Sequence, residues 1–161
     1  MLGEYQYPKQ ILLGILQRFK ENNDFLYELD AQTRLADLEF LFGFYEKARE
    51  GYSESLELAA YTHQKSLESS ILEKMGDTYE KEGKAQEAIK CYSAAATRCE
   101  QHYRCGGKAS ILYKQAQAYQ VLGEESKAQA LYKQALALVS DDSGEQMKAL
   151  RKKITEAQKK K

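Results

Sequence analysis

Proline and tryptophan are the most obvious gaps in this 161-residue sequence, which has one proline and no tryptophan. The single proline, Pro8, excludes a proline-rich or loop-rich architecture, because proline concentrates in turns and linkers. No stretch reaches the roughly 20 apolar residues that a membrane-spanning helix needs. The start, MLGEYQYPKQ, has neither the basic region nor the small-residue cleavage site of a signal peptide. We therefore expect a helical protein with no membrane partner.

Cysteine is also scarce, with three residues: Cys91, Cys99 and Cys105. An odd number argues against a disulfide framework and favours a reducing compartment, so we expect a cytoplasmic protein. Zinc takes four Cys or His ligands, and Cys99, His102 and Cys105 are spaced three apart. Cys91, however, lies beside a core tyrosine, and Cys99 falls at a position that is apolar elsewhere in the chain. Both are interpreted as small packing residues, and we expect no metal and no cofactor.

Net charge gives no case for nucleic acid or an anionic membrane, because 24 basic and 24 acidic side chains cancel. The charge is uneven along the chain: residues 1–60 carry 6 basic and 11 acidic side chains, and residues 101–161 carry 12 and 6. The basic end is suited to an acidic partner. The 12 tyrosines mostly fall at packing positions, so they do not indicate a face on which bases stack.

Catalytic motifs are missing as well. The sequence has no glycine-rich phosphate loop, no His–Glu metal helix and no nucleophile elbow. Glu73, Asp77 and Glu80 lie at one-turn spacing, but this pattern is typical of a solvated or groove-facing side of a helix. We therefore predict that the protein is not an enzyme.

A 40-residue period is the main feature that is present. Five sets of residues keep this step: Gly43, Gly83 and Gly123; Ala48, Ala88 and Ala128; Tyr52, Tyr92 and Tyr132; Ala36, Gly76 and Ala116; and Ser55, Ala95 and Ala135. A period of 20–50 residues is the signature of a solenoid, in which one supersecondary unit stacks on the next.

Two glycines show what the period means physically. Gly83 lies between two amphipathic stretches, where a helix ends and only glycine enters the left-handed region without a clash. Gly76 lies inside the first helix, at a cost of about 1 kcal/mol against alanine, which favours close approach of another helix. Ala88 and Ala95, two turns apart on the second helix, are the expected partner surface.

The pattern of aliphatic, Gly/Ala, Tyr, Gly, Ala, Tyr and Ala residues resembles the tetratricopeptide repeat (TPR) in a long, 40-residue variant. The match is strong over Leu72–Ala96 and Leu112–Ala135, and weaker over Gln32–Ser55, where Glu39 replaces Tyr79 and Tyr119. The resemblance implies an all-α, right-handed α-solenoid of antiparallel helix pairs. We expect one TPR-like domain over 1–161, with repeats at 24–63, 64–105 and 106–142.

Helical periodicity and turn residues place the helices of this solenoid. The expected pairs are Phe25–Phe42 with Tyr45–Thr62, Lys65–Glu82 with Lys84–Tyr103, and Lys108–Leu122 with Glu125–Val139. Cys105-Gly106-Gly107 and residues 140–143 are expected breaks, and Ser143 with Gln146 forms a capping box. Residues 143–161 form a C-terminal capping helix and basic tail, whose helix, Gly144–Gln158, has one apolar face made of Met147, Leu150, Ile154 and Ala157.

The first 23 residues have two interpretations. Leu2-Gly3 resembles Leu122-Gly123, and Leu12 and Ile15 fall at the positions of Tyr52 and Ser55. Residues 1–23 are thus a half repeat of a longer solenoid, or else a natural capping helix. In the first case Ile11 and Ile15 lie on a face without a partner, which is exposed in a monomer or covered by weak self-association.

The resemblance also implies a concave groove lined by the first helix of each pair, which binds a peptide segment or helix of another protein. Its expected residues are Arg34, Asp37, Phe40, Leu41, Glu73, Lys74, Asp77, Lys81, Tyr113, Lys114 and Gln117. The best-known members grip a terminal carboxylate through Lys and Asn, but this chain has Asp37 and Asp77 there, with Thr33 and Glu73 where a lysine would be wanted. This argues against binding of a chain terminus.

Two hypotheses about the groove remain. In one, the partner brings basic or amide groups to Asp37, Glu73 and Asp77, and Phe40 with Leu41 anchors it. In the other, the acids pair within the groove, for example Asp77 with Lys74 or Lys81. The predicted function is a non-catalytic protein–protein interaction scaffold. The alternative is a TPR sensor within a peptide-regulated signalling or transcription regulator.

Overall fold

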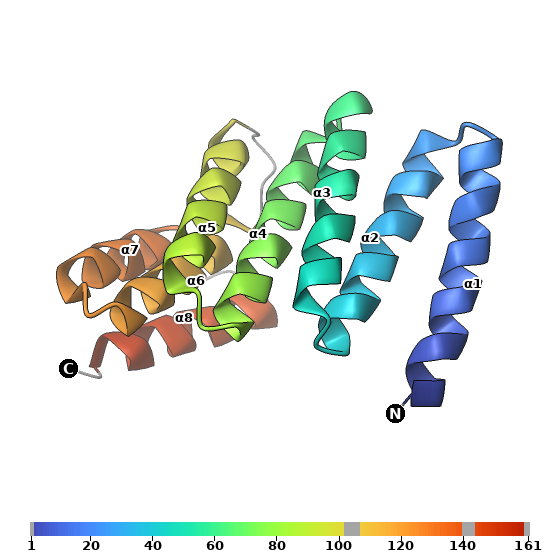
Figure 1. Ribbon diagram of the computed structural model, residues 1–161. Coiled ribbons are helices and arrows are strands. Elements are labelled where there is room, and N and C mark those ends of the chain that lie inside the picture. The colour runs from blue at the N-terminus through green and yellow to red at the C-terminus, as the bar shows by residue number, and fades with distance from the viewer. Residues whose placement is uncertain (1, 102–106, 140–143, 160–161) are drawn as a thin grey trace.

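The computed structural model describes residues 2–101, 107–139 and 144–159 (Figure 1). Over these residues the chain forms helices and no strands. The helices are α1 (Leu2–Glu21), α2 (Phe25–Leu41), α3 (Tyr45–Tyr61), α4 (Lys65–Lys81), α5 (Ala85–Glu100), α6 (Lys108–Val121), α7 (Glu125–Ala137) and α8 (Glu145–Lys159).

Each helix packs on the next one along the chain, so the fold is an all-α solenoid of antiparallel pairs. The pairs are α2 with α3, α4 with α5, and α6 with α7, as the periodicity predicts. Most predicted helix ends agree with the structure within two residues. Residues 140–143, and with them Ser143 of the predicted capping box, lie outside the described residues, as do Cys105 and Gly106.

The turns repeat at twice the frequency that the glycines indicate. Gly43, Gly83 and Gly123 have φ between 74° and 80°, and Asn23 and His63 adopt the same left-handed conformation at 54° and 56°. At Gly83 the chain closes a Schellman motif, in which Gly83 N donates to Glu80 O and Lys84 N to Tyr79 O. A left-handed residue therefore ends each helix from α1 to α4 at 20-residue spacing, and Gly123, 40 residues after Gly83, ends α6 in the same way.

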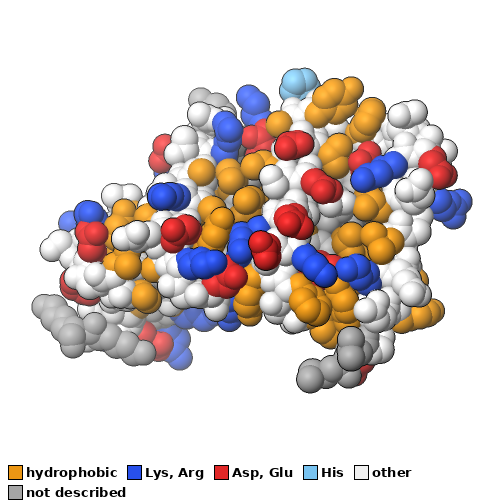
Figure 2. Space-filling view, viewed as in Figure 1, with side chains coloured by type: hydrophobic (Ala, Val, Ile, Leu, Met, Phe, Trp, Pro, Cys, Tyr) orange, Lys and Arg blue, Asp and Glu red, His pale blue; other side chains and the backbone are white. Residues whose placement is uncertain are grey.

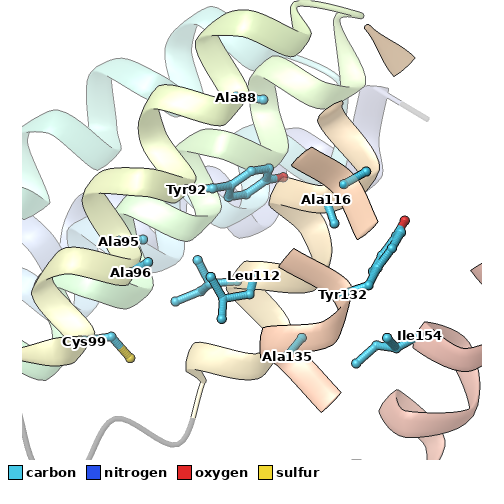
Figure 3. Packing of buried hydrophobic residues seen from close by; sticks show 12 residues of the cluster. Ala88, Tyr92, Ala95, Ala96, Cys99, Leu112, Ala116, Tyr132, Ala135 and Ile154 are labelled. Atoms are coloured by element: carbon cyan, nitrogen blue, oxygen red, sulfur yellow. The ribbon is translucent and has the colours of Figure 1, made fainter. Parts of the chain in front are cut away.

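The repeated small residues and tyrosines form the core. Ala48, Ala88 and Ala128, the three tyrosines at 52, 92 and 132, and Ser55, Ala95 and Ala135 are all at most 1% exposed. Figure 3 shows this packing around Tyr92 and Tyr132, with Ala88 and Ala95 on α5 and Ala116 on α6. The predicted close contact between the two helices of a pair is confirmed at these positions.

Helix α1 packs on α2 through a buried polar cluster. Glu39, which breaks the tyrosine column, accepts a hydrogen bond of 2.5 Å from the Tyr5 hydroxyl and one of 2.6 Å from Lys9 Nζ. The ring of Tyr5 packs on those of Phe42 and Phe44. A carboxylate is thus buried at position 39 because α1 supplies its donors. On helix α1, Ile11 and Ile15 are 45% and 38% exposed, and residues 1–23 keep both interpretations, a half repeat or a capping helix.

Helix α8 closes the other end of the solenoid. Ile154 is fully buried, and Leu150 and Ala157 pack against the same core cluster. In Figure 1, α8 crosses beneath α6 toward the end of α4. The predicted apolar face is confirmed, and lysines and arginines cover the opposite side.

The cysteines differ in part from the prediction. Cys91 is a free thiol, half-buried, with its pKa raised by burial. Cys99 is buried as expected, but it is disulfide-bonded, so the argument against disulfides from the odd cysteine count is wrong at this residue, and Cys99 is more than a packing residue. His102 and Cys105, which belong to the possible zinc pattern, lie outside the described residues. The described part of the chain contains no cluster of metal-ligating side chains. None of the described helices is long and apolar enough to cross a membrane.

Candidate protein-binding groove

The first helices of the three pairs, α2, α4 and α6, line one face of the solenoid, which we call the groove face. Two cavities open on it, one between α2 and α4 and one bounded by α2, α4, α6 and α8. Figure 2 shows acidic and basic side chains interspersed over the surface of the solenoid, with hydrophobic side chains gathered between them. Charge of one sign therefore does not dominate the side in view.

The first cavity, of about 330 Å³, has apolar walls and a charged rim. Leu29 and Ile71 form its buried floor, while Leu26 and Leu67 leave 55% and 43% of their surface exposed. The rim is formed by Asp30, Thr33, Arg34, Asp37, Gln64, Ser70 and Lys74. This combination of apolar anchor space and polar positioning groups is typical of a binding site.

The second cavity, of about 400 Å³, is enclosed partly by α8. Phe40 of α2 and Tyr113 of α6 supply aromatic walls, and Leu150 of α8 faces them. The polar lining consists of Asp77, Glu80, Lys81, Ser110, Lys114, Gln117 and Lys153. The C-terminal helix thus contributes to the groove face as well as closing the core.

The structure brings most of the predicted groove residues into these two cavities. Arg34, Asp37 and Lys74 line the first; Phe40, Asp77, Lys81, Tyr113, Lys114 and Gln117 line the second. Glu73 lies beside them, bonded to Lys114. Leu41 lies apart: it is 76% exposed and faces a cavity of about 480 Å³ between α1 and α2, with Pro8, Ile11, Leu12 and Leu38. Arg34 and Asp37 line this cavity too, so it adjoins the first cavity, and the joint anchor of Phe40 and Leu41 stays a prediction.

The acids of the groove face form a ladder that repeats every 40 residues. Lys74 Nζ donates to both oxygens of Asp37 at 2.5 and 2.6 Å, and the Tyr52 hydroxyl donates to the same carboxylate at 2.7 Å. One repeat later, Lys114 Nζ donates to Asp77 at 2.7 and 2.8 Å, and the Tyr92 hydroxyl donates to it at 2.8 Å. Each rung joins three successive helices.

The pairs therefore connect successive repeats, and Asp77 bonds to Lys114 instead of Lys74 or Lys81. Lys114 also bonds Glu73 at 2.8 Å, which leaves Asp37, Glu73 and Asp77 each with a lysine. Arg34 is drawn outward to Asp30 on its own helix. A partner that brings basic groups to these acids would therefore have to displace lysines that are already bonded to them.

Sequence reasoning missed the tyrosine hydroxyls in this ladder, although a signal was present. Asp37 and Asp77 are each followed by a tyrosine 15 residues later and a lysine 37 residues later. In the third repeat the aspartate position is Gln117, and the matching lysine position is Ile154. Tyr132 donates instead to Gln120, at 2.6 Å. The third repeat therefore has no aspartate at this position for a lysine to pair with.

Burial and side-chain bonds raise the pKa values of three tyrosines and one lysine in and beside the ladder. Burial, followed by the bonds to Asp37, raises the pKa of Tyr52, and burial with the charge of Asp77 raises the pKa of Tyr92. Burial also raises the pKa of Tyr132, to about 12. For Lys114, burial is the largest influence and acts to lower the pKa, but the bonds to Asp77 and Glu73 outweigh it and raise the pKa overall.

These shifts predict loss of stability at alkaline pH. The pKa of Tyr92 is above 10.0 in the folded state, so the unfolded chain releases this proton first as the pH rises. The contribution of the protonated phenol to stability is therefore complete below pH 10 and is lost as the pH rises further. In urea melts between about pH 9 and 11, Tyr92→Phe should reduce the slope of unfolding free energy against pH by up to about 1.4 kcal/mol per pH unit.

Tyr7→Phe is the matched control, because Tyr7 is 71% exposed and should keep the wild-type slope. A Tyr92→Phe protein with the same slope as the wild type would show that the Tyr92 hydroxyl is not held in its protonated form by the fold.

Comparison with known proteins identifies the class and then the family. A solenoid of antiparallel helix pairs with small residues at each pair contact is a helical-repeat protein. A family profile described as tetratricopeptide repeat matches residues 27–101 and 67–141, which together span most of the chain. The chain belongs to the tetratricopeptide repeat family, as its resemblance implied. No curated protein matches it.

Solved structures with the same fold come from diverse proteins. The TPR domain of Arabidopsis FLU superposes with a TM-score of 0.66 at 23% identity, covering 70% of this chain and 95% of that one. BtubC from P. vanneervenii gives 0.79 at 18% identity, covering 96% and 66%. The type III secretion translocator chaperone SycD of Yersinia enterocolitica gives 0.67 at 19% identity, covering 81% and 87%. These likenesses show the fold.

Proposed function

We propose that the chain is a non-catalytic protein-interaction scaffold that binds a peptide segment or helix of a partner protein on the groove face. The observation that carries this proposal is the cavity between α2 and α4, whose apolar walls stay exposed beside a polar rim. Membership of a family of interaction modules supports it, as does the presence of a chaperone among the proteins of the same fold.

The ladder changes the chemistry expected of the partner at this cavity. Asp37 and Lys74 already neutralise each other, so the rim presents hydrogen-bonding groups with little net charge. Leu26 and Leu67 therefore provide the main binding energy, through burial of apolar surface at about 25 cal/mol per Å². A partner segment with aliphatic side chains at helical or extended spacing fits these walls.

The test uses peptides selected on the immobilised full chain from a random-sequence display library. Leu67→Glu should weaken their binding at least about tenfold, because it places a charge in an apolar contact. Leu67 is 43% exposed, so the substitution should leave the fold intact by circular dichroism.

Leu13→Glu is the matched control, since Leu13 is 44% exposed on α1, away from the groove face. Selected peptides that bind Leu67→Glu as tightly as wild type, or that lose affinity for Leu13→Glu instead, would show that binding takes place elsewhere.

A further inference from the structure

A cavity of about 410 Å³ lies at the junction of the second and third helix pairs. It is lined by Glu80 at the end of α4, Gly83 and Ala85 at the α4–α5 turn, and Gln117, Ala118, Gln120 and Val121 on the last turn and a half of α6. Ala118 is buried and forms the floor, whereas Val121 is 74% exposed at the rim. This cavity is separate from the α2–α4 cavity used above.

The 40-residue period shows why this space exists. One repeat earlier, the positions of Glu80 and Ala85 are occupied by Phe40 and Tyr45, whose rings pack with centroids 5.8 Å apart. At that earlier junction Arg49 also bonds Glu82 and lies over the ring of Tyr79. At the later junction the residue in place of Arg49 is Ile89.

Three large side chains are thus replaced by a glutamate, an alanine and an isoleucine. The fold around them repeats, because Thr78 and Ala118, the equivalent floor residues, are both buried. Space that a tyrosine ring fills at the first junction is consequently open at the second. A volume of this size lies in the range of pockets that hold a ligand group.

The electrostatics of the cavity select the charge of its occupant. Glu80 is the single charged residue in the lining, and it accepts a hydrogen bond of 2.8 Å from the Tyr92 hydroxyl. Within the described part of the chain no lysine or arginine forms an ion pair with it, in contrast to Asp37, Glu73 and Asp77. An exposed carboxylate beside an apolar pocket is complementary to a cation.

We propose that this cavity receives an aromatic side chain from a segment of a partner protein, with an adjacent lysine or arginine paired to Glu80. The ring occupies the place that Tyr45 fills one repeat earlier and lies on Ala85, Ala118 and Val121. Gln117 and Gln120 offer amide groups to the segment's backbone. The inference rests on the proposed function, because it assigns part of the scaffold's specificity to a second contact point.

The test is protein-detected NMR of the full chain with two short probes, acetyl-Phe-Arg-amide and acetyl-Phe-Glu-amide. The first should shift the amide signals of Gly83, Ala118 and Val121 in a saturable way. The second should bind at least about fivefold more weakly, because its carboxylate faces Glu80. Glu80→Gln should bring the two affinities together.

Ala85→Tyr restores the side chain of the first junction and should weaken the acetyl-Phe-Arg-amide titration at least about tenfold by filling the pocket. Val121→Ser, at a solvent-exposed rim position, serves if the tyrosine disturbs folding, and should weaken binding of the ring because it removes apolar contact without adding charge. Leu138→Ser is its matched control, at an exposed leucine directly after α7, and should change nothing.

Some outcomes separate this inference from the proposed function. Shifts centred on Leu26, Leu67 and Ile71 would keep the groove face as a binding site and overturn the aromatic pocket. Absence of a saturable shift, equal affinity of the two probes for the wild type, or unchanged binding in both Ala85→Tyr and Val121→Ser would overturn it as well. Two results together would overturn the α2–α4 site alone. Acetyl-Phe-Arg-amide would still shift the signals of Gly83, Ala118 and Val121 in the Leu67→Glu protein, and the selected peptides would bind that protein as tightly as wild type.

Discussion

Replacing Gly76 with leucine should destabilise the protein by at least about 1–3 kcal/mol, because the side chain has no space. A Cβ atom at this position would lie 2.4 Å from Tyr92 Cε1, 2.7 Å from Cδ1 and 3.0 Å from Cζ. The ring cannot move away easily: Tyr92 is fully buried, and its hydroxyl is bonded to Asp77 and Glu80. Even Gly76→Ala should therefore be destabilising, measured as the midpoint and slope of a urea melt.

Gly14→Ala is the opposite case and a sharp control. Gly14 is also inside a helix, but a Cβ there would meet nothing within 4 Å. The same chemical change should stabilise the protein by up to about 1 kcal/mol through helix propensity. If both alanine substitutions stabilised the protein, the close contact between Gly76 and Tyr92 would not exist in solution.

This contrast shows which part of the fold could be predicted from the sequence. Gly76, Ala36 and Ala116 share a position across three repeats, so their small size could be assigned to a helix contact without coordinates. A lone glycine such as Gly14 carries no such signal. Asn23 and His63 lie at predicted helix ends, but their left-handed conformation was not predicted, because the residue type changes from the glycine of the other turns.

The candidate site was predicted less completely, since periodicity fixes positions but does not choose partners. The period placed Asp37, Lys74 and Asp77 on first helices, and the structure agrees. It did not distinguish a lysine one turn away on the same helix from one on the next repeat, and the longer-range pair is the one that forms. The lysine of the next repeat lies within reach of the aspartate, 37 residues before it, and a tyrosine hydroxyl fixes the position of each carboxylate.

The cavities form where residues differ from those at the equivalent positions of the other repeats. A consensus pattern does not record such differences. Ala85 in place of Tyr45 opens one, and α8, which does not repeat the register of α6, bounds another. Glu39 in place of a tyrosine provides the buried bonds to α1. In a repeat protein the shared residues build the scaffold, and the residues that break the pattern give each face its own chemistry.

The second large effect is expected at the C-terminal helix, where Ile154→Ala should cost about 2–5 kcal/mol locally. Ile154 is completely shielded from solvent, with 0% of its surface exposed. In Figure 3 it points from α8 toward Tyr132 and Ala135 of α7. It is the only buried residue of α8 among those described. Ile154 is therefore the central contact of this helix, and Leu150 and Ala157 pack beside it.

Native-state hydrogen exchange measures the result directly. Because α8 packs mainly on α7, at the end of the solenoid, Ile154→Ala should remove protection from residues 145–159 and leave that of α2 to α5 close to wild type. Leu138→Ala, at a leucine that is 49% exposed, should leave α8 protected. If protection instead fell equally in every helix, α8 would unfold only with the whole chain, and the apolar contact at Ile154 would be part of one cooperative core and not the attachment of a separate cap.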